Sequence, residues 1–128
     1  MPRATVDDLL ARARERFERL TPGEALAAVR AGALLVDIRS ESQRAADGVV
    51  PQAVFVPRNV LEWRLDPDSG VANPVLARPE ARVIVMCDEG HQSSLAAATL
   101  QDLGFARATD LIGGFQAWKA AGLPVTSQ

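Results

Sequence analysis

Short apolar runs alternate with longer amphipathic segments along this chain. Four runs of mostly β-branched or aliphatic residues predict strands, at Leu34–Val36, Ala53–Val56, Val83–Met86 and Ala108–Leu111. The segments around them carry apolar residues three or four positions apart, which is the spacing of a helix with one buried face. Because strands alternate with helices, we expect an α/β domain whose mainly parallel central sheet is covered by helices on both faces.

Four helices are predicted from this spacing and from end signals. Thr5 can cap a first helix whose apolar stripe continues to Leu20, although the last residues of this stretch could instead be a short strand. Thr21-Pro22-Gly23-Glu24 is a capping box that starts a helix ending at Gly32. Two more are expected from Leu95 to Gly104 and after Gly113-Gly114, with Trp118 of the latter in the core.

Composition narrows the class of protein. The chain has 128 residues, of which 48% are hydrophobic, so it suits a single domain with a substantial core. Its net charge of −2 is unsuited to nucleic-acid binding, which depends on a basic surface. Neither a signal peptide nor an apolar run of the roughly 20 residues needed to span a bilayer is visible, so we expect a cytoplasmic protein that does not bind membranes.

The chain has few residues that could form a disulfide or bind a metal ion. Cys87 is the only cysteine and His91 the only histidine. One cysteine cannot form an internal disulfide. A closed zinc site needs four ligands, usually cysteine and histidine, so we expect no metal centre.

Cys87 lies where a predicted strand ends and a helix is about to begin. In parallel α/β folds, ligands and catalytic groups gather at the carboxyl ends of the strands. Backbone N–H groups and the dipole at the start of a helix stabilise an anion there. The sequence therefore favours Cys87 as a nucleophilic thiolate over an inert buried thiol.

Four motifs in order resemble the rhodanese family of sulfurtransferases in its single-domain form. They are Leu35-Val36-Asp37-Ile38-Arg39, Gly48-Val49-Val50-Pro51-Gln52-Ala53, Cys87-Asp88-Glu89-Gly90-His91-Gln92-Ser93 and Leu111-Ile112-Gly113-Gly114-Phe115-Gln116-Ala117-Trp118. The third is similar to the family's C-x-x-G-x-R-S loop. The likeness covers about four-fifths of the chain, from Thr21 to Val125. It implies a rhodanese-like three-layer domain over residues 21–128, preceded by an amphipathic helical extension over residues 1–20 that packs on it.

The resemblance also implies an activity. A Cys87 thiolate would take sulfane sulfur from a small or protein-borne donor and pass it, through a Cys87 persulfide, to a thiol or another nucleophile. No cofactor would be needed. The residues expected to bind substrate through loop amides and side chains are Asp88, Glu89, Gly90, His91, Gln92 and Ser93. Arg58 and Arg64 are candidates for the rim of the pocket, because the long segment after Pro57 is expected to pass near the loop.

Departures from the family pattern bear on two other functions. Gln92 stands where many members have arginine, and Asp88 and Glu89 place negative charge beside the thiol, so we expect thiosulfate to react poorly. The chain could therefore be a catalytically slow module that acts as sulfur carrier, redox sensor or partner-binding domain. A phosphatase or arsenate reductase is disfavoured, since their C-x5-R loops end in an arginine that grips oxyanions.

Several side chains also have structural interpretations. His91 could pair with the thiolate or be a simple exposed loop residue. Ser93 and Ser94 are expected mainly as helix caps. Asp37 is expected to form a structural hydrogen bond, whereas Arg39 and Arg44 are expected in surface ion pairs.

Overall fold

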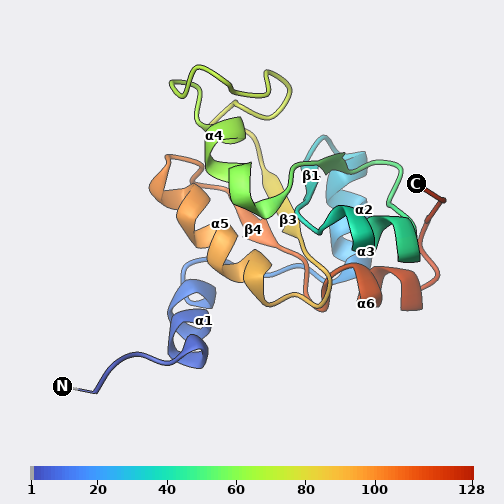
Figure 1. The fold of residues 1–128 in the computed structure, drawn as a ribbon, viewed down its shortest axis with the longest axis horizontal. Helices are drawn as coiled ribbons and strands as arrows, with labels where there is room; N and C mark the ends of the chain where they lie inside the picture. Colours follow the sequence, from blue (N-terminus) through green and yellow to red (C-terminus); the bar gives the residue numbers. More distant parts are fainter. Residues whose placement is uncertain (1) are drawn as a thin grey trace.

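The computed structural model describes residues 2–128 and contains a four-stranded parallel sheet (Figure 1). Its strands run in the order β2-β1-β3-β4. Their bounds are Leu34–Asp37 for β1, Val54–Phe55 for β2, Val83–Met86 for β3 and Thr109–Asp110 for β4. The α/β architecture expected from the sequence is confirmed. Within residues 2–128, no helix combines the length and the apolar character needed to cross a membrane.

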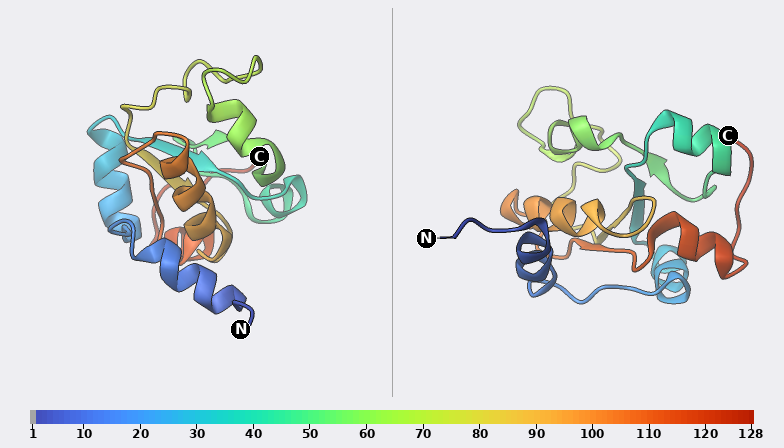
Figure 2. Two further views of the ribbon diagram at one scale, coloured as in Figure 1. Left: turned by 90° about the vertical axis from the view of Figure 1, so that its left-hand side faces the viewer. Right: turned by 60° about the horizontal axis from the view of Figure 1, so that its bottom comes forward.

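Helices cover both faces of the sheet. Side chains of α4 (Leu61–Leu65) and α5 (Gln92–Asp102) pack on one face, and those of α2 (Pro22–Arg30) and α6 (Gly114–Ala120) pack on the other. A further helix, α1 (Val6–Arg14), packs against α5 (Figure 2). The short helix α3 (Glu41–Asp47) follows β1, and the 3-10 turn η1 (Arg58–Val60) precedes α4.

The central strand β3 divides its side chains between two buried clusters. Val83 and Val85 point to the cluster under α4 and α5, whereas Ile84 and Met86 join Trp118 in the cluster under α2 and α6. This alternation follows from the two-residue period of a strand. Cys87 continues it and falls on the α5 side, in the first cluster. The strand therefore directs the thiol toward the helix that follows it.

The structure changes the bounds of two expected helices and adds a helix that the sequence analysis did not predict. The first helix ends at Arg14, where the chain turns, and the backbone of Leu20 then forms an isolated parallel bridge with Leu111. This single bridge is not a strand of the sheet, so the end of the stretch forms neither the expected helix nor the alternative short strand. The helix expected from Leu95 starts earlier, at Gln92. The sequence analysis missed α3, a helix without buried residues and so without an apolar stripe, although Ser40 and Gln43 form a capping box at its start.

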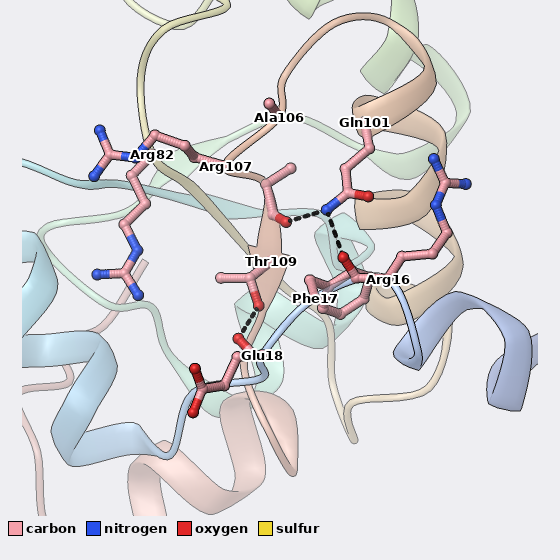
Figure 3. Close-up of a pocket in the computed structure, with 9 residues that line it drawn as sticks. Arg16, Phe17, Glu18, Arg82, Gln101, Ala106, Arg107 and Thr109 are labelled. Carbon is pink, nitrogen blue, oxygen red and sulfur yellow. Dashed lines mark hydrogen bonds between the residues drawn. The ribbon is translucent and has the colours of Figure 1, made fainter.

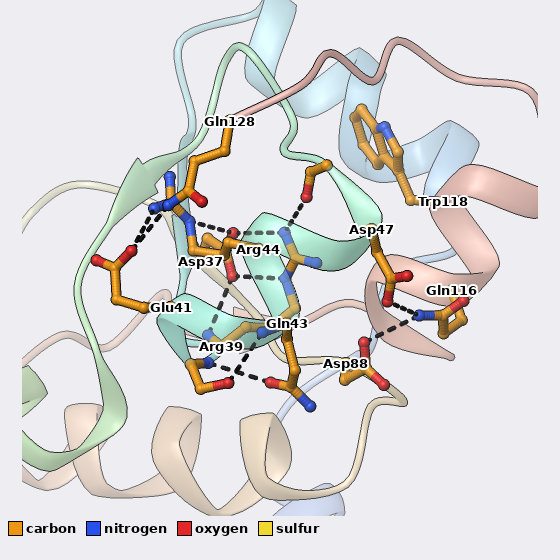
Figure 4. A network of polar contacts seen from close by, with 12 residues as sticks. Asp37, Arg39, Glu41, Gln43, Arg44, Asp47, Asp88, Gln116, Trp118 and Gln128 are labelled. Carbon is orange, nitrogen blue, oxygen red and sulfur yellow. Dashed lines mark hydrogen bonds and ion pairs between the residues drawn. The ribbon is translucent and has the colours of Figure 1, made fainter.

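A buried ion pair joins β1 to the opposite layer. Asp37 accepts hydrogen bonds from Nε and Nη2 of Arg39 at 3.1 and 2.9 Å, and Nη2 also donates to the Gly48 carbonyl at 2.9 Å (Figure 4). The Arg39 guanidinium lies 3.7 Å from the centre of the Phe115 ring on α6. Arg44 lies 3.4 Å from the same carboxylate. The surface ion pair expected for Arg39 is therefore wrong, because this side chain is fully buried.

Replacing Arg39 by methionine is expected to destabilise the fold strongly. Methionine keeps an apolar stem, but the buried Asp37 carboxylate loses both hydrogen bonds from the Arg39 guanidinium. Removing one member of a buried pair typically costs about 3–5 kcal/mol. The free energy of unfolding in urea measures this loss. Arg58→Met, which breaks the partly exposed pair with Glu62, is the matched control and is expected to cost less than about 1 kcal/mol. Equal losses in the two variants would contradict a structural role for the Asp37–Arg39 pair.

Candidate active site

The loop between β3 and α5 brings a backbone amide onto the thiol of Cys87. Cys87 is 2% exposed at the carboxyl end of β3, and the N–H of Gly90 donates to its Sγ at 3.2 Å. Gly90 has a φ of +85°, and a Cβ placed there would lie 2.7 Å from the amide nitrogen of Gly113. Both the left-handed backbone and the close approach require glycine at this position. Glycine is thus required for the loop to adopt this conformation, and the N–H of the same residue is the donor to Sγ of Cys87.

A cavity of about 300 Å³ opens over the thiol. Its walls are formed by Gln43, Cys87, Asp88, Glu89, His91 and Gln92. The structure thus brings together five of the seven loop residues expected from the sequence. His91 is exposed in this wall and precedes the first residue of α5. Gln43 comes from α3 and was missed, since its sequence signal is that of a helix cap and carries no chemistry.

A second hollow adjoins the first, because Gln43 and Gln92 line both. It has a volume of about 500 Å³ and extends to Arg58, which is also paired with Glu62 at 3.1 Å. Arg64 behaves differently, since its Nη1 donates to the Val71 carbonyl at 2.9 Å and it lines neither of these two hollows. Of the two arginines expected at the rim, the structure brings only Arg58 near the site.

Ser93 and Ser94 face away from the cavity. Their hydroxyls both donate to Oδ2 of Asp110, each at 2.8 Å. Asp110 is fully buried on β4, so its carboxylate needs hydrogen-bond donors and takes these two. The helix-capping role expected for the serines is wrong: α5 begins after His91 without any side-chain cap. The side chain of Ser93 therefore anchors α5 to β4 and does not line the cavity.

Two arginines from the start of the chain hold the loop from behind. Nη2 of Arg14 and Nη2 of Arg19 each donate to the carbonyl oxygen of Gly90 at 2.9 Å. Arg14 also donates through Nε to Oγ of Ser94 at 2.9 Å, and Arg19 donates through Nε to Asp110 at 2.8 Å. The sequence analysis missed both residues, because contacts across more than 70 positions leave no local pattern.

The two acidic residues beside the thiol are held differently. Oδ1 of Asp88 accepts a hydrogen bond from Nε2 of Gln116 at 3.0 Å, and the same amide group also reaches Asp47 (Figure 4). Glu89 is exposed on the cavity wall. Both carboxylates therefore border the cavity, but Asp88 is tied to α6. Negative charge at the mouth disfavours anionic substrates.

Another cavity lies away from this loop. It has a volume of about 340 Å³, and Arg82 and Arg107 lie in its wall, just before β3 and β4 (Figure 3). It is therefore at the amino ends of these strands, and Cys87 is not part of it. Throughout residues 2–128, no three His, Cys, Asp or Glu side chains gather as metal ligands.

Comparison with known proteins identifies a family and named relatives. The rhodanese-like domain family matches residues 21–121. The thiosulfate sulfurtransferase GlpE of Stutzerimonas stutzeri is 36% identical over 103 residues, which cover 80% of this chain and 85% of that protein. A sulfurtransferase of Allochromatium vinosum is 33% identical over 95 residues, covering 73% and 78% of the two chains.

Solved structures share the architecture. A Rhodopseudomonas palustris protein described as of unknown function and a possible tyrosine phosphatase superposes with a TM-score of 0.87 at 32% identity, covering 98% of this chain and 99% of that one. The polysulfide-sulfur transferase homodimer of Wolinella succinogenes gives a TM-score of 0.69 at 26% identity, covering 93% and 85%. The rhodanese-like three-layer fold is thereby confirmed.

Replacing Gly90 by alanine is expected to raise the pH at which Cys87 becomes reactive. The added Cβ overlaps the Gly113 backbone, so the loop must shift and the amide is drawn off Sγ. A thiolate that loses a hydrogen bond becomes harder to form. The rate of Cys87 alkylation by iodoacetamide, followed across pH, measures the change. Gly104→Ala is the matched control, since Gly104 has a similar φ of +97° but open space around it. An unchanged profile in a folded Gly90→Ala protein would contradict the assignment of this amide.

Proposed function

The chain belongs to the rhodanese-like family, and from this membership we propose a sulfurtransferase that carries the transferred sulfur as a persulfide on Cys87. One observation carries the choice of residue. The only cysteine of the chain lies at the base of a cavity with the Gly90 amide directed at its sulfur. An amide in that position stabilises a sulfur anion before the reaction and again when one is regenerated.

The first half-reaction would load the enzyme. The Cys87 thiolate attacks the outer sulfur of a sulfane donor, a new S–S bond forms on Sγ, and the donor's own S–S bond breaks. The bonding pair leaves with the donor residue, as sulfite from thiosulfate or as a thiolate from an organic persulfide. This is covalent catalysis, in which one transfer is divided into two easier displacements.

The second half-reaction would unload it. An acceptor thiolate, or cyanide, attacks the outer sulfur of the Cys87 persulfide and takes it with formation of a new bond. The pair of the broken S–S bond returns to Sγ, which regenerates the thiolate next to the Gly90 amide. No net oxidation or reduction of the protein occurs over the two steps. Thiols of cytoplasmic proteins are kept reduced, which suits a reaction through a free thiol, and we therefore propose the cytoplasm as its compartment.

The charge around the cavity favours particular donors. Asp88 and Glu89 border the opening, and the loop positions from Cys87 to Ser93 hold no arginine. A doubly charged donor such as thiosulfate would be repelled. We therefore propose that the sulfur donor carries less charge than thiosulfate or is bound to a protein, and that the acceptor is a thiol. The second hollow, which reaches Arg58 through Gln92, offers space for the part of such a substrate that lies beyond the reacting sulfur.

The description of the Rhodopseudomonas palustris structure as a possible phosphatase does not transfer to this chain. Phosphoryl transfer at a cysteine loop needs an arginine that binds the phosphate oxygens with two parallel hydrogen bonds. The arginines that contact this loop are Arg14 and Arg19, and both direct Nη2 at the Gly90 carbonyl. Neither lines the cavity above Cys87. The cavity thus has no guanidinium with which to hold a phosphate.

Intact mass after incubation with sulfane donors tests the proposal. The parent protein is expected to gain the mass of one sulfur with an organic persulfide, more slowly with mercaptopyruvate or thiosulfate, and to lose it when a thiol is added. Cys87→Ser is expected to gain nothing. The control is Cys87→Ser combined with Ser127→Cys, which moves the thiol to an exposed position near the end of the chain and is expected to show no turnover.

Three results would count against this function. If the parent protein gains no sulfur from any of the three donors, the catalytically slow module becomes the better interpretation. If the relocated thiol turns over as fast as the parent, the cavity and the loop amide contribute nothing to the chemistry. Sulfur gained at Cys87 but never passed to a thiol would support a carrier over an enzyme.

A further inference from the structure

The carbonyl of Gly90 accepts two charged hydrogen bonds from outside the part of the chain that the family match covers. Arg14 and Arg19 supply them, and the match begins at residue 21. We propose that these two arginines are positioning residues for the active loop, so that the segment before residue 21 completes the site. What this inference means for catalysis rests on the proposed function. The effect of the two arginines on the Cys87 thiol is argued from geometry alone.

Both ends of Gly90 are held, and this determines where its amide points. Its N–H donates to Sγ of Cys87 at 3.2 Å, while its carbonyl lies 2.9 Å from each guanidinium nitrogen. Glycine has wide conformational freedom, so a glycine loop keeps one orientation only if its neighbours impose it. Hydrogen bonds from a charged donor are roughly twice as strong as neutral ones. The two arginines therefore restrain the rotation that would take the amide away from sulfur.

The arginines are themselves held in place. Arg19 bonds through Nε and Nη2 to the two carboxylate oxygens of Asp110, at 2.8 and 3.1 Å. Arg14, at the end of α1, donates to Oγ of Ser94 at 2.9 Å. The stretch between them is tied down as well, because Thr109 donates its hydroxyl to the Glu18 carbonyl and Gln101 donates to that of Arg16 (Figure 3). Both guanidinium groups are therefore held in position by side chains of α5 and β4.

Charge supports the same role. The titratable groups that line the cavity with Cys87 are Asp88, Glu89 and His91, so both permanent charges at the opening are negative. Behind the loop, the charge of Arg19 is balanced by Asp110. Arg14 forms no ion pair with any residue in the described range 2–128, and its charge acts on the Gly90 peptide. It supplies positive charge to a loop that contains no arginine.

Arg14→Met in the full-length chain tests the proposal, since Arg14 can be removed without stranding the buried Asp110. The pH profile of Cys87 alkylation is expected to move to higher pH, and sulfur transfer at neutral pH to slow by about tenfold. Arg14→Lys keeps the charge but offers a single compact donor, and is expected to fall between Arg14→Met and the parent. Arg12→Met removes the same charge from the exposed side of α1 and is the control, expected to match the parent.

The outcomes separate this inference from the proposed function. If a folded Arg14→Met protein has the parent's alkylation profile, the positioning role is wrong, whatever the parent does with sulfur donors. If the profile moves equally in Arg12→Met, general charge is responsible and the contact to Gly90 is not. If the profile moves as expected but the parent transfers no sulfur, the positioning role stands and the sulfurtransferase fails. Should Arg14→Met unfold, Arg14→Lys carries the same test.

Discussion

The site depends on one restrained residue, Gly90, which must present its N–H to the sulfur of Cys87. That requirement forces a left-handed backbone and a close approach to Gly113, and so excludes any side chain at the position. The start of α6 also approaches the loop closely, at Cys87. The amide of Phe115 donates to the Cys87 carbonyl at 2.8 Å, and a Cβ on Gly114 would lie 2.5 Å from that oxygen. The loop is thus fixed at both of its ends by backbone contacts.

The wider fold supplies the rigidity that these contacts need. Asp110 receives Ser93, Ser94 and Arg19 at one edge of the loop, and so links α5 and the segment before residue 21 to β4. On the far side, the buried Asp37–Arg39 pair stacks on Phe115 and holds α6. Both networks are buried ionic clusters, and removing one partner from such a cluster destabilises the fold strongly. The loop is therefore positioned by two buried carboxylates that never touch the thiol.

Local patterns in the sequence predicted the parts of this arrangement that are local. The apolar run Val83–Met86 and the glycine signals gave the strand, the loop and the position of Cys87 correctly. Such patterns could not predict contacts between segments that are far apart in the sequence. Nothing in the spacing of Arg14 or Arg19 indicates that they meet at Gly90, and Ser93 and Ser94 look like helix caps until Asp110 is placed beside them. Arg39 looked like a surface residue, because its burial against the Phe115 ring joins segments that are far apart in the sequence.

The most direct test follows the amide of Gly90 itself by ¹⁵N NMR while pH is varied. The account predicts that its proton signal moves downfield as Cys87 ionises, with a midpoint equal to that of Cys87 alkylation, and that this titration disappears in Cys87→Ser. The amide of Gly104, which has a similar backbone conformation far from the thiol, is expected to stay unchanged. A Gly90 signal that ignores the ionisation of Cys87 would contradict the central claim.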